Sequence, residues 1–201
     1  MSGLFIVLEG IDGAGTTTQL TRLKAWLEGM GHEVEDTFEP TDGPIGSYIR
    51  NIIRGEQANP HPNALALLFA ADRVDHLARQ IEPALKAGRH VICDRYVGSS
   101  LAYQGSECDP DWVRRINQNA SSPDLTLYLQ VDAETALARI QGRDGERRDL
   151  YERLDKLERI AAGYDRVYPE ELEATIVDAS ADPDTVFDVC REAVYQLMLA
   201  P

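Results

Sequence analysis

The sequence predicts an α/β fold in which a parallel five-stranded sheet lies between two layers of helices. Short apolar runs alternate with longer segments whose apolar residues recur every three or four positions. The runs are typical of strands buried in a parallel sheet, and the recurring spacing is typical of amphipathic helices. Strands that alternate with helices favour parallel pairing through right-handed crossovers. At 201 residues, we expect one domain over 1–201 that has room for a short lid.

The first half of the chain supplies three expected strands and three expected helices. The strands are 4–8, 32–38 and 90–93, and the helices are 16–28, 45–54 and 63–86. Glycines at 29 and 31 end the first helix. Pro83 has no backbone N–H to donate, so we expect an irregularity near the end of the long third helix.

The second half continues the alternation. Asp109 and Pro110 are a cap and a first-turn proline, and they open a helix that runs to residue 119. The remaining strands are 123–131 and 174–177, and the remaining helices are 133–140, 150–167 and 183–199. Between two of these helices, the polar segment 139–149 contains four arginines. Such a segment is either a solvated loop or a lid, about 141–150, that brings guanidinium groups over phosphates.

Composition excludes several classes of function. The net charge of −14 argues against non-specific binding to nucleic acid or to an anionic membrane. No apolar run approaches the 18 residues of a membrane span, and we expect no signal peptide. The three cysteines show no CxxC spacing, which argues against a disulfide framework or a zinc site and is compatible with a reducing cytoplasm.

The stretch between the first strand and the first helix predicts a phosphate-binding loop. Gly10 and Gly15 have the spacing of the GxxxxGK(S/T) pattern, in which glycines let successive N–H groups point inward. Thr16 stands where the pattern has lysine, and Thr17 stands where a hydroxyl ligates magnesium. The loop residues are Gly10, Ile11, Asp12, Gly13, Ala14, Gly15, Thr16, Thr17 and Thr18. Taken alone, the stretch is also compatible with an ordinary tight turn of small residues.

Two further pairs are candidate site residues. Asp94 and Arg95 follow the strand 90–93, and the carboxyl ends of parallel strands face one ligand crevice. These two residues suit a magnesium nucleotide, although an acid and an arginine there can also be a capping pair at the surface. Phe69 and Arg73 lie four residues apart on one helix stripe, where the plain interpretation is a core phenylalanine beside a solvated arginine.

Taken together, these motifs resemble the thymidylate kinase family, the P-loop enzymes that phosphorylate dTMP to dTDP with ATP. The similarity covers essentially the whole chain in order. It rests on the loop GIDGAG (10–15), Glu-Pro-Thr (39–41), LFAADR (68–73), DRYVGSSLAYQG (94–105), PDLTLYL (123–129) and Gly-Tyr (163–164). The segment 94–105 is the most specific part. The resemblance implies a P-loop fold, a cytoplasmic homodimer, and Mg²⁺ as cofactor beside ATP.

The resemblance also implies roles at matching positions. The loop would hold the ATP phosphates, with Thr17 on magnesium and Asp94 supporting the ion through water. Arg95 would grip the dTMP phosphate, with Arg50 a weaker candidate, and Asp12 would lie near the acceptor's sugar and phosphate. Phe69 would stack on thymine and Arg73 would hydrogen-bond its edge. The remaining implied residues are Glu39, Ser100 and Gln104 at the substrate, Tyr103 and Tyr164 against the deoxyribose, and Arg143, Arg147 and Arg148 in the lid.

Two departures from the family pattern are evident. Phe38 stands where many members have a basic residue, and Thr16 replaces the loop lysine. Loss of a transition-state donor costs about 3–4 kcal/mol, so we expect another cation to compensate, first Arg147 or Arg148. The alternatives are a catalytically silent homologue that binds nucleotide, and a kinase for another nucleoside monophosphate.

Overall fold

The computed structural model describes residues 3–144, 150–168 and 172–199. Its parallel sheet has five strands in the order β2-β3-β1-β4-β5, which confirms the predicted architecture. The strands are β1 (Phe5–Glu9), β2 (Val34–Phe38), β3 (His90–Asp94), β4 (Leu125–Gln130) and β5 (Thr175–Asp178). Every residue of β1 is buried, because the strand lies at the centre of the sheet and helices cover both of its faces.

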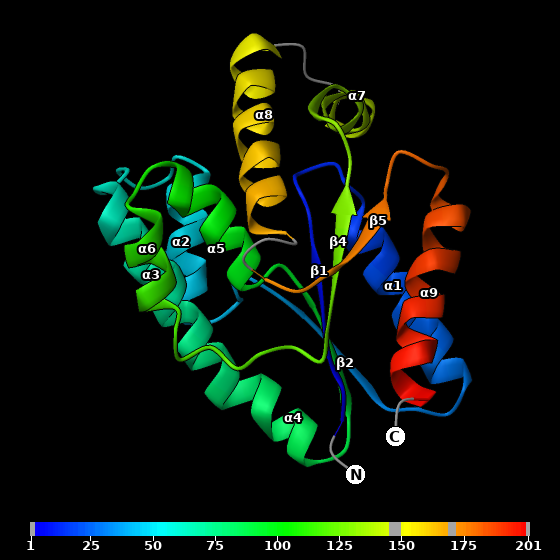
Figure 1. The fold of residues 1–201 in the computed structure, drawn as a ribbon. Helices are drawn as coiled ribbons and strands as arrows, with labels where there is room; N and C mark the ends of the chain where they lie inside the picture. Colours follow the sequence, from blue (N-terminus) through cyan, green and yellow to red (C-terminus); the bar gives the residue numbers. More distant parts are fainter. Residues whose placement is uncertain (1–2, 145–149, 169–171, 200–201) are drawn as a thin grey trace.

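Helices cover the sheet on both sides (Figure 1). Helices α1 (Thr16–Gly29) and α9 (Pro183–Leu199) pack together on one side. The opposite side carries α2 (Pro44–Ile53), α3 (Pro62–His76), α4 (Glu82–Lys86), α5 (Val97–Tyr103) and α6 (Pro110–Ile116). Helices α7 (Ala133–Asp144) and α8 (Leu150–Val167) stand above the carboxyl ends of the strands.

The long helix predicted over 63–86 is interrupted. Helix α3 ends at His76, a π-helical turn follows at Leu77–Ile81, and α4 then starts at Glu82. The irregularity expected from Pro83 is confirmed, and it lies in the turn that precedes the proline. Pro83 cannot donate to a carbonyl one turn back, so the backbone there adopts a wider hydrogen-bonding pattern.

Helix α7 is longer than predicted. It continues to Asp144, whereas the sequence pattern placed its end at 140 and assigned 141–144 to the lid. Gln and Arg are good helix formers, and a single glycine, Gly142, lowers helix propensity without ending the helix. The rest of the predicted lid, 145–149, lies outside the described residues.

Strand register brings the site residues together. Leu8 of β1 pairs with Asp94 of β3, so the loop after β1 and the segment after β3 leave the sheet side by side. The amide of Arg95 donates to the carbonyl of Leu8 at 2.9 Å, which fixes that approach. The crevice predicted beyond the strand ends is therefore formed by residues distant in sequence.

Candidate active site

The loop between β1 and α1 has the backbone of an anion-binding site. Gly13 and Gly15 have φ angles of 88° and 97°, a region that side chains disfavour. A Cβ at Gly13 would lie 2.4 Å from the carbonyl oxygen of Ala136 in α7, so the loop packs there only as glycine. Gly15 precedes α1 and offers no capping side chain, so the first N–H groups of α1 are left for another acceptor.

The two threonines that open α1 differ in environment. Thr16 is 7% exposed, and its methyl group would lie 3.5 Å from a Cβ on Gly10, so it packs beneath the loop. Thr17 donates its hydroxyl to Oδ2 of Asp94 at 2.7 Å. The other oxygen of Asp94, Oδ1, is buried without a hydrogen-bond partner. A hydroxyl and an orphaned carboxylate oxygen at a helix N-terminus are hard oxygen donors that suit Mg²⁺.

Arg95 occupies the centre of the crevice. Its backbone is left-handed, with φ 72°, and this directs its side chain back toward the loop. The guanidinium lies 2.7 Å from the carboxylate of Asp12 and 3.2 Å from the hydroxyl of Tyr103. Burial would lower the pKa of Arg95, but the surrounding tyrosines and carboxylates outweigh burial and raise it, so the guanidinium stays charged. A held guanidinium beside a phosphate-binding loop is suited to bind a second phosphate.

Glu9, which sequence reasoning did not select, holds the surroundings of Arg95 in place. Its carboxylate accepts hydrogen bonds from the amides of Tyr96 and Ser99 at 2.9 and 3.0 Å. It also accepts from the hydroxyls of Ser99 and Tyr164 at 2.6 and 2.9 Å. Burial raises the pKa of Glu9, while the bonds from Ser99 act in the opposite direction. A charged residue ending an otherwise apolar strand is the sequence signal that could have identified it.

A pocket of about 470 Å³ opens beside Arg95 and collects most of the predicted substrate residues. Its lining includes Asp12, Glu39, Phe69, Arg95, Ser100, Tyr103 and Gln104. The side-chain oxygen of Gln104, Oε1, is buried without a hydrogen-bond partner and is thus available to a ligand. The pocket offers aromatic side chains, polar groups and the cation of Arg95, a combination that suits an aromatic ligand bearing an anionic group.

The interpretation of Arg73 as a solvated arginine is wrong, because the structure buries this side chain. It is 1% exposed and lies behind Ser100, to whose hydroxyl it donates at 3.1 Å. Its guanidinium also bonds Asn117 and forms an ion pair with Glu39 at 2.7 Å. Burial of this cation is compensated by these partners. The position predicted to read a base edge therefore supports the pocket from behind in this structure.

Glu39 is held in turn by a histidine that sequence reasoning missed. Nδ1 of His76 lies 3.1 Å from Glu39, and Nε2 of the same ring lies 2.7 Å from the hydroxyl of Thr37. His76 follows Arg73 by three residues on α3, so its spacing is a signal that could have placed it on the same stripe. Together, Thr37, His76, Glu39 and Arg73 form a buried polar network beneath the pocket.

Two other predicted residues lie outside the pocket lining. Arg50 donates to the carbonyl of Pro40 at 2.7 Å and pairs with Asp42 at 2.7 Å, so it holds the loop after β2. Its guanidinium also lies 5.8 Å from the ring centre of Phe38. Tyr164 is fully buried behind Ser99, where its hydroxyl contacts Glu9.

Helix α8 adds cations to the pocket that sequence reasoning did not assign. Lys156, Arg159 and Ile160 all line it. Lys156 and Ile160 precede Tyr164 by eight and four residues, so helical periodicity from Tyr164 could have found them. Of the predicted lid arginines, Arg147 and Arg148 lie outside the described residues. Arg143 falls in the last turn of α7, and its side chain also lies outside them.

The fold and the crevice define a P-loop phosphotransferase, with a phosphate-binding loop on one side and a pocket for a phosphorylated aromatic acceptor on the other. A profile of the thymidylate kinase family matches residues 8–189. The chain belongs to this family, and it is an enzyme that transfers phosphate from ATP to dTMP.

Individual relatives agree with the family match. A probable thymidylate kinase from Pyrococcus horikoshii is 48% identical over 148 residues, which cover 71% of this chain and 72% of the relative. A probable thymidylate kinase from Pyrococcus abyssi is 39% identical over 195 residues, 94% of each chain. A thymidylate kinase from Leifsonia xyli subsp. xyli is 41% identical over 188 residues, 89% of this chain and 88% of the relative.

Proposed function

We propose that Arg95 binds the phosphate of dTMP while the loop 10–18 binds the phosphates of ATP, which places acceptor and donor on either side of Asp12. The single observation that supports this most strongly is the ion pair between Arg95 and Asp12 at 2.7 Å, because it joins the loop to the acceptor pocket. Phosphoryl transfer requires in-line positioning and charge neutralisation more than covalent chemistry by the protein. A charged arginine shared between both sides meets that requirement.

In the same proposal, the pocket beside Arg95 holds the nucleoside part of dTMP. Phe69 stacks on the thymine ring, and Ser100 and Gln104 hydrogen-bond its edge. The buried, unpartnered Oε1 of Gln104 supports that assignment. Arg73 and Glu39 act at the base through Ser100 and the pocket wall, while Tyr103 lies against the deoxyribose.

Magnesium is the implied cofactor, and Thr17 and Asp94 are the residues that would hold it. Among the described residues, no group of three or more His, Cys, Asp or Glu side chains is arranged to hold a metal ion, so most ligands of the ion would be phosphate and water oxygens. When bound, the ion neutralises charge on the phosphates. Asp94 orients the Thr17 hydroxyl toward this position through their hydrogen bond of 2.7 Å.

The cation that replaces the loop lysine is proposed to come from the lid. Thr16 is too short to reach phosphates and packs beneath the loop. Arg147 and Arg148 are the first candidates, and Arg143, in the last turn of α7, is the next. All belong to a stretch dense in arginine in a chain of net charge −14.

A homodimer and a cytoplasmic location complete the proposal. The outward face of α3 supports the dimer, because Leu67 and Val74 are 49% and 50% exposed and line an open groove with Ala71 and Ala78. Within the described ranges, no helix is both long and apolar enough to cross a membrane.

The experiment that tests the proposal is dTDP formation from dTMP and Mg-ATP, with Thr16→Lys assayed beside the natural sequence. We expect turnover by the natural chain, which would mean that another cation fills the lysine's role. Turnover only after Thr16→Lys would support the silent homologue, and activity in neither would contradict the proposal. Comparison of dTMP with dUMP, dCMP and dGMP as acceptors distinguishes a kinase for dTMP from a kinase for another nucleoside monophosphate.

A further inference from the structure

A buried series of polar contacts ends at a hydroxyl that lines the acceptor pocket. It starts at His76 and passes through Glu39 and Arg73 to Ser100. All four residues are 5% exposed or less, so water does not compete for these contacts. Because some of the groups can only donate and others can only accept, the direction of each hydrogen bond can be assigned.

The first contact fixes one proton on His76. Its Nδ1 lies 3.1 Å from Oε1 of Glu39, and an ionised carboxylate only accepts hydrogen bonds, so Nδ1 carries a proton. Nε2 lies 2.7 Å from the hydroxyl of Thr37, which can donate or accept and therefore suits that nitrogen in either state. The ring thus holds one oxygen of Glu39, while the other lies 2.7 Å from the guanidinium of Arg73.

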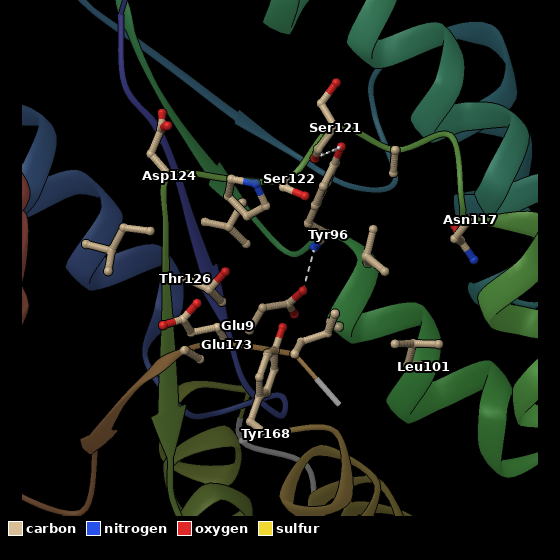
Figure 2. Close-up of a pocket in the computed structure, with 18 of the residues that line it drawn as sticks. Glu9, Tyr96, Leu101, Asn117, Ser121, Ser122, Asp124, Thr126, Tyr168 and Glu173 are labelled. Carbon is tan, nitrogen blue, oxygen red and sulfur yellow. Dashed lines mark hydrogen bonds between the residues drawn. The ribbon is translucent and has the colours of Figure 1, made fainter. Parts of the chain in front are cut away.

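Arg73 transmits this order because a guanidinium has donors only. Its Nη2 faces Glu39 and also donates to the carbonyl of Tyr96 at 2.9 Å. Figure 2 shows that Tyr96 is held in turn, because its amide donates to Glu9. Arg73 is therefore fixed from two sides, and the contact of its Nη1 with the hydroxyl of Ser100, at 3.1 Å, has one possible direction.

Ser100 is left as a donor to the pocket. Its oxygen accepts from Arg73, and within the described residues this is the one hydrogen bond of its side chain. Its O–H group therefore remains for an acceptor atom of a ligand. Gln104 lines the same pocket, but an amide can turn either its oxygen or its NH₂ group toward a ligand. Of these two groups, only the hydroxyl is held in one orientation by a buried cation.

A fixed donor distinguishes two kinds of pyrimidine base. Thymine and uracil carry the carbonyl oxygen O4 where cytosine carries an amino group. A hydroxyl held as a donor binds the carbonyl, whereas against the amino group it leaves two buried donors facing each other without an acceptor. A hydroxyl that is free to turn accommodates both bases.

We propose that His76 is a positioning residue that makes the acceptor site select a carbonyl over an amino group on the pyrimidine ring. It acts through Glu39 and Arg73, which hold the Ser100 hydroxyl as a donor. Without the N–H group of His76, Glu39 turns away or takes up a proton, and Arg73 loses the partner that aligns it. This role rests on the proposed function, because it requires the base of dTMP to lie beside Ser100.

The selectivity is measured as the Kd of dCMP divided by the Kd of dTMP, by titration calorimetry on the full chain. His76→Leu fills a similar volume without a donor, and we expect this ratio to fall about tenfold or more. His76→Asn places an N–H group where Nδ1 now lies, and it should keep most of the ratio. Because dUMP also carries O4, the ratio of the Kd values of dUMP and dTMP should stay unchanged in both variants.

Gln80→Leu is the matched control. Gln80 follows His76 by four residues, and its amide donates to Glu35 of β2 at 3.1 Å, outside this series of contacts. It should leave the ratio unchanged, and thermal unfolding confirms that each variant folds. If His76→Leu does not fold, His76→Gln replaces it, because its amide lies near the position of Nε2 beside Thr37 and should lose the ratio likewise.

A ¹⁵N NMR spectrum of the histidine side chains gives a second measurement on the natural chain. We expect Nδ1 of His76 to be protonated, and the signal is assigned by its absence in His76→Asn. An unprotonated Nδ1 would overturn the proposal.

An unchanged Kd ratio in the folded variant without the donor would also overturn it, and an equal loss in His76→Asn would show a merely structural role. A natural chain that binds no dTMP, or makes no dTDP, would instead contradict the proposed function, so the two failures are distinguishable.

Discussion

At the scale of single residues, the position of Arg95 depends on Glu9, a buried carboxylate that does not itself line the acceptor pocket. Glu9 accepts three hydrogen bonds from the segment that follows Arg95 and a fourth from Tyr164 of α8. Two of the donor groups, the hydroxyls of Ser99 and Tyr164, also contact the guanidinium. Sequence motifs identify the arginine, but they do not reveal which buried carboxylate orients it.

Glu9→Gln should weaken the acceptor site specifically. Glutamine keeps the shape but places an NH₂ group where one of the four donors now points, and an unsatisfied buried donor costs about 1–3 kcal/mol. We expect kcat/KM for dTMP to fall about tenfold or more, while KM for ATP stays close to its natural value. Steady-state kinetics with each substrate varied in turn provides the measurement.

Glu192→Gln is the matched control, because Glu192 is exposed on α9 and accepts a hydrogen bond from Gln196, one turn further along the same helix. It should leave both KM values unchanged. An equal loss for ATP and dTMP in Glu9→Gln would show a general structural role and would contradict positioning of Arg95.

The lid arginines offer a second residue-scale prediction. If Arg147 and Arg148 supply the charge that Thr16 lacks, the double replacement by alanine should lower kcat about 100-fold or more, as expected for a lost transition-state donor. Arg139→Ala, which removes a surface contact to the carbonyl of Ser180, is the control. An unchanged kcat after replacement of Arg147 and Arg148 would reject the idea.

Arg73 illustrates what sequence cannot resolve at this scale. Helical spacing correctly placed it on the stripe of Phe69, but spacing does not reveal partners supplied by other elements. Its contacts come from Glu39 after β2, Ser100 in α5 and Asn117 after α6. An arginine four residues after a phenylalanine on a helix can be solvated or buried, and only the folded structure distinguishes the two.

At the scale of elements, the strands and most helices were predictable because each depends on local patterning. Helix α8 begins and ends where predicted, at 150 and 167, and β3 extends one residue past its predicted end. The predicted end of α7 was wrong because Gly142 is only a weak helix breaker. The position of the π-helical turn before Pro83 depends on backbone hydrogen bonding, which sequence indicates only as an irregularity.

A histidine pair joins the starts of two strands to the loop before β2. Nδ1 of His90 accepts from the amide of Leu4 at 2.9 Å, so the proton lies on Nε2, 3.2 Å from His32. Burial, followed by the charge of His32, lowers the pKa of His90 from its ordinary 6.5. The folded chain therefore keeps His90 neutral at pH values where the unfolded chain binds a proton.

This arrangement predicts a loss of stability in mild acid. The contribution of His90 is fully present above pH 6.5 and is lost as the pH falls toward its lowered folded pKa. His90→Asn, whose carbonyl can still accept from Leu4, should flatten the pH dependence of the unfolding free energy between pH 7 and 5. Denaturant unfolding at several pH values measures it, with exposed His61→Asn as the control. An unaltered slope in His90→Asn would contradict this assignment.

At the scale of the whole molecule, sheet order rather than any single motif assembles the site. The order β2-β3-β1-β4-β5 places β1 between β3 and β4, so the loop 10–18 lies beside Asp94 and Arg95. The alternation of elements predicted a parallel sheet, and the family resemblance implied which motifs meet. The hydrogen bonds that converge on Glu9 were not predictable, because their donors come from the segment after β3 and from α8, which no sequence motif joins.

Helix α3 connects the acceptor pocket to the proposed dimer face. Leu65 and Phe69 line the pocket, whereas Leu67 and Val74 point away from it into the exposed groove. A partner packed on the groove would therefore steady the helix that carries Phe69. In this arrangement, association of two chains would support binding of dTMP without adding a residue to the site.

Leu67→Glu combined with Val74→Glu should convert the dimer to a monomer, because it places four carboxylates at a twofold contact that has lost its apolar groups. Sedimentation equilibrium measures the mass, and Val189→Glu, at an exposed position of α9, is the control, which should remain dimeric. We expect KM for dTMP to rise more than KM for ATP in the monomer, since α3 contributes to the acceptor pocket alone. A natural chain that sediments as a monomer, or a double variant that stays dimeric, would show that this face is not the interface.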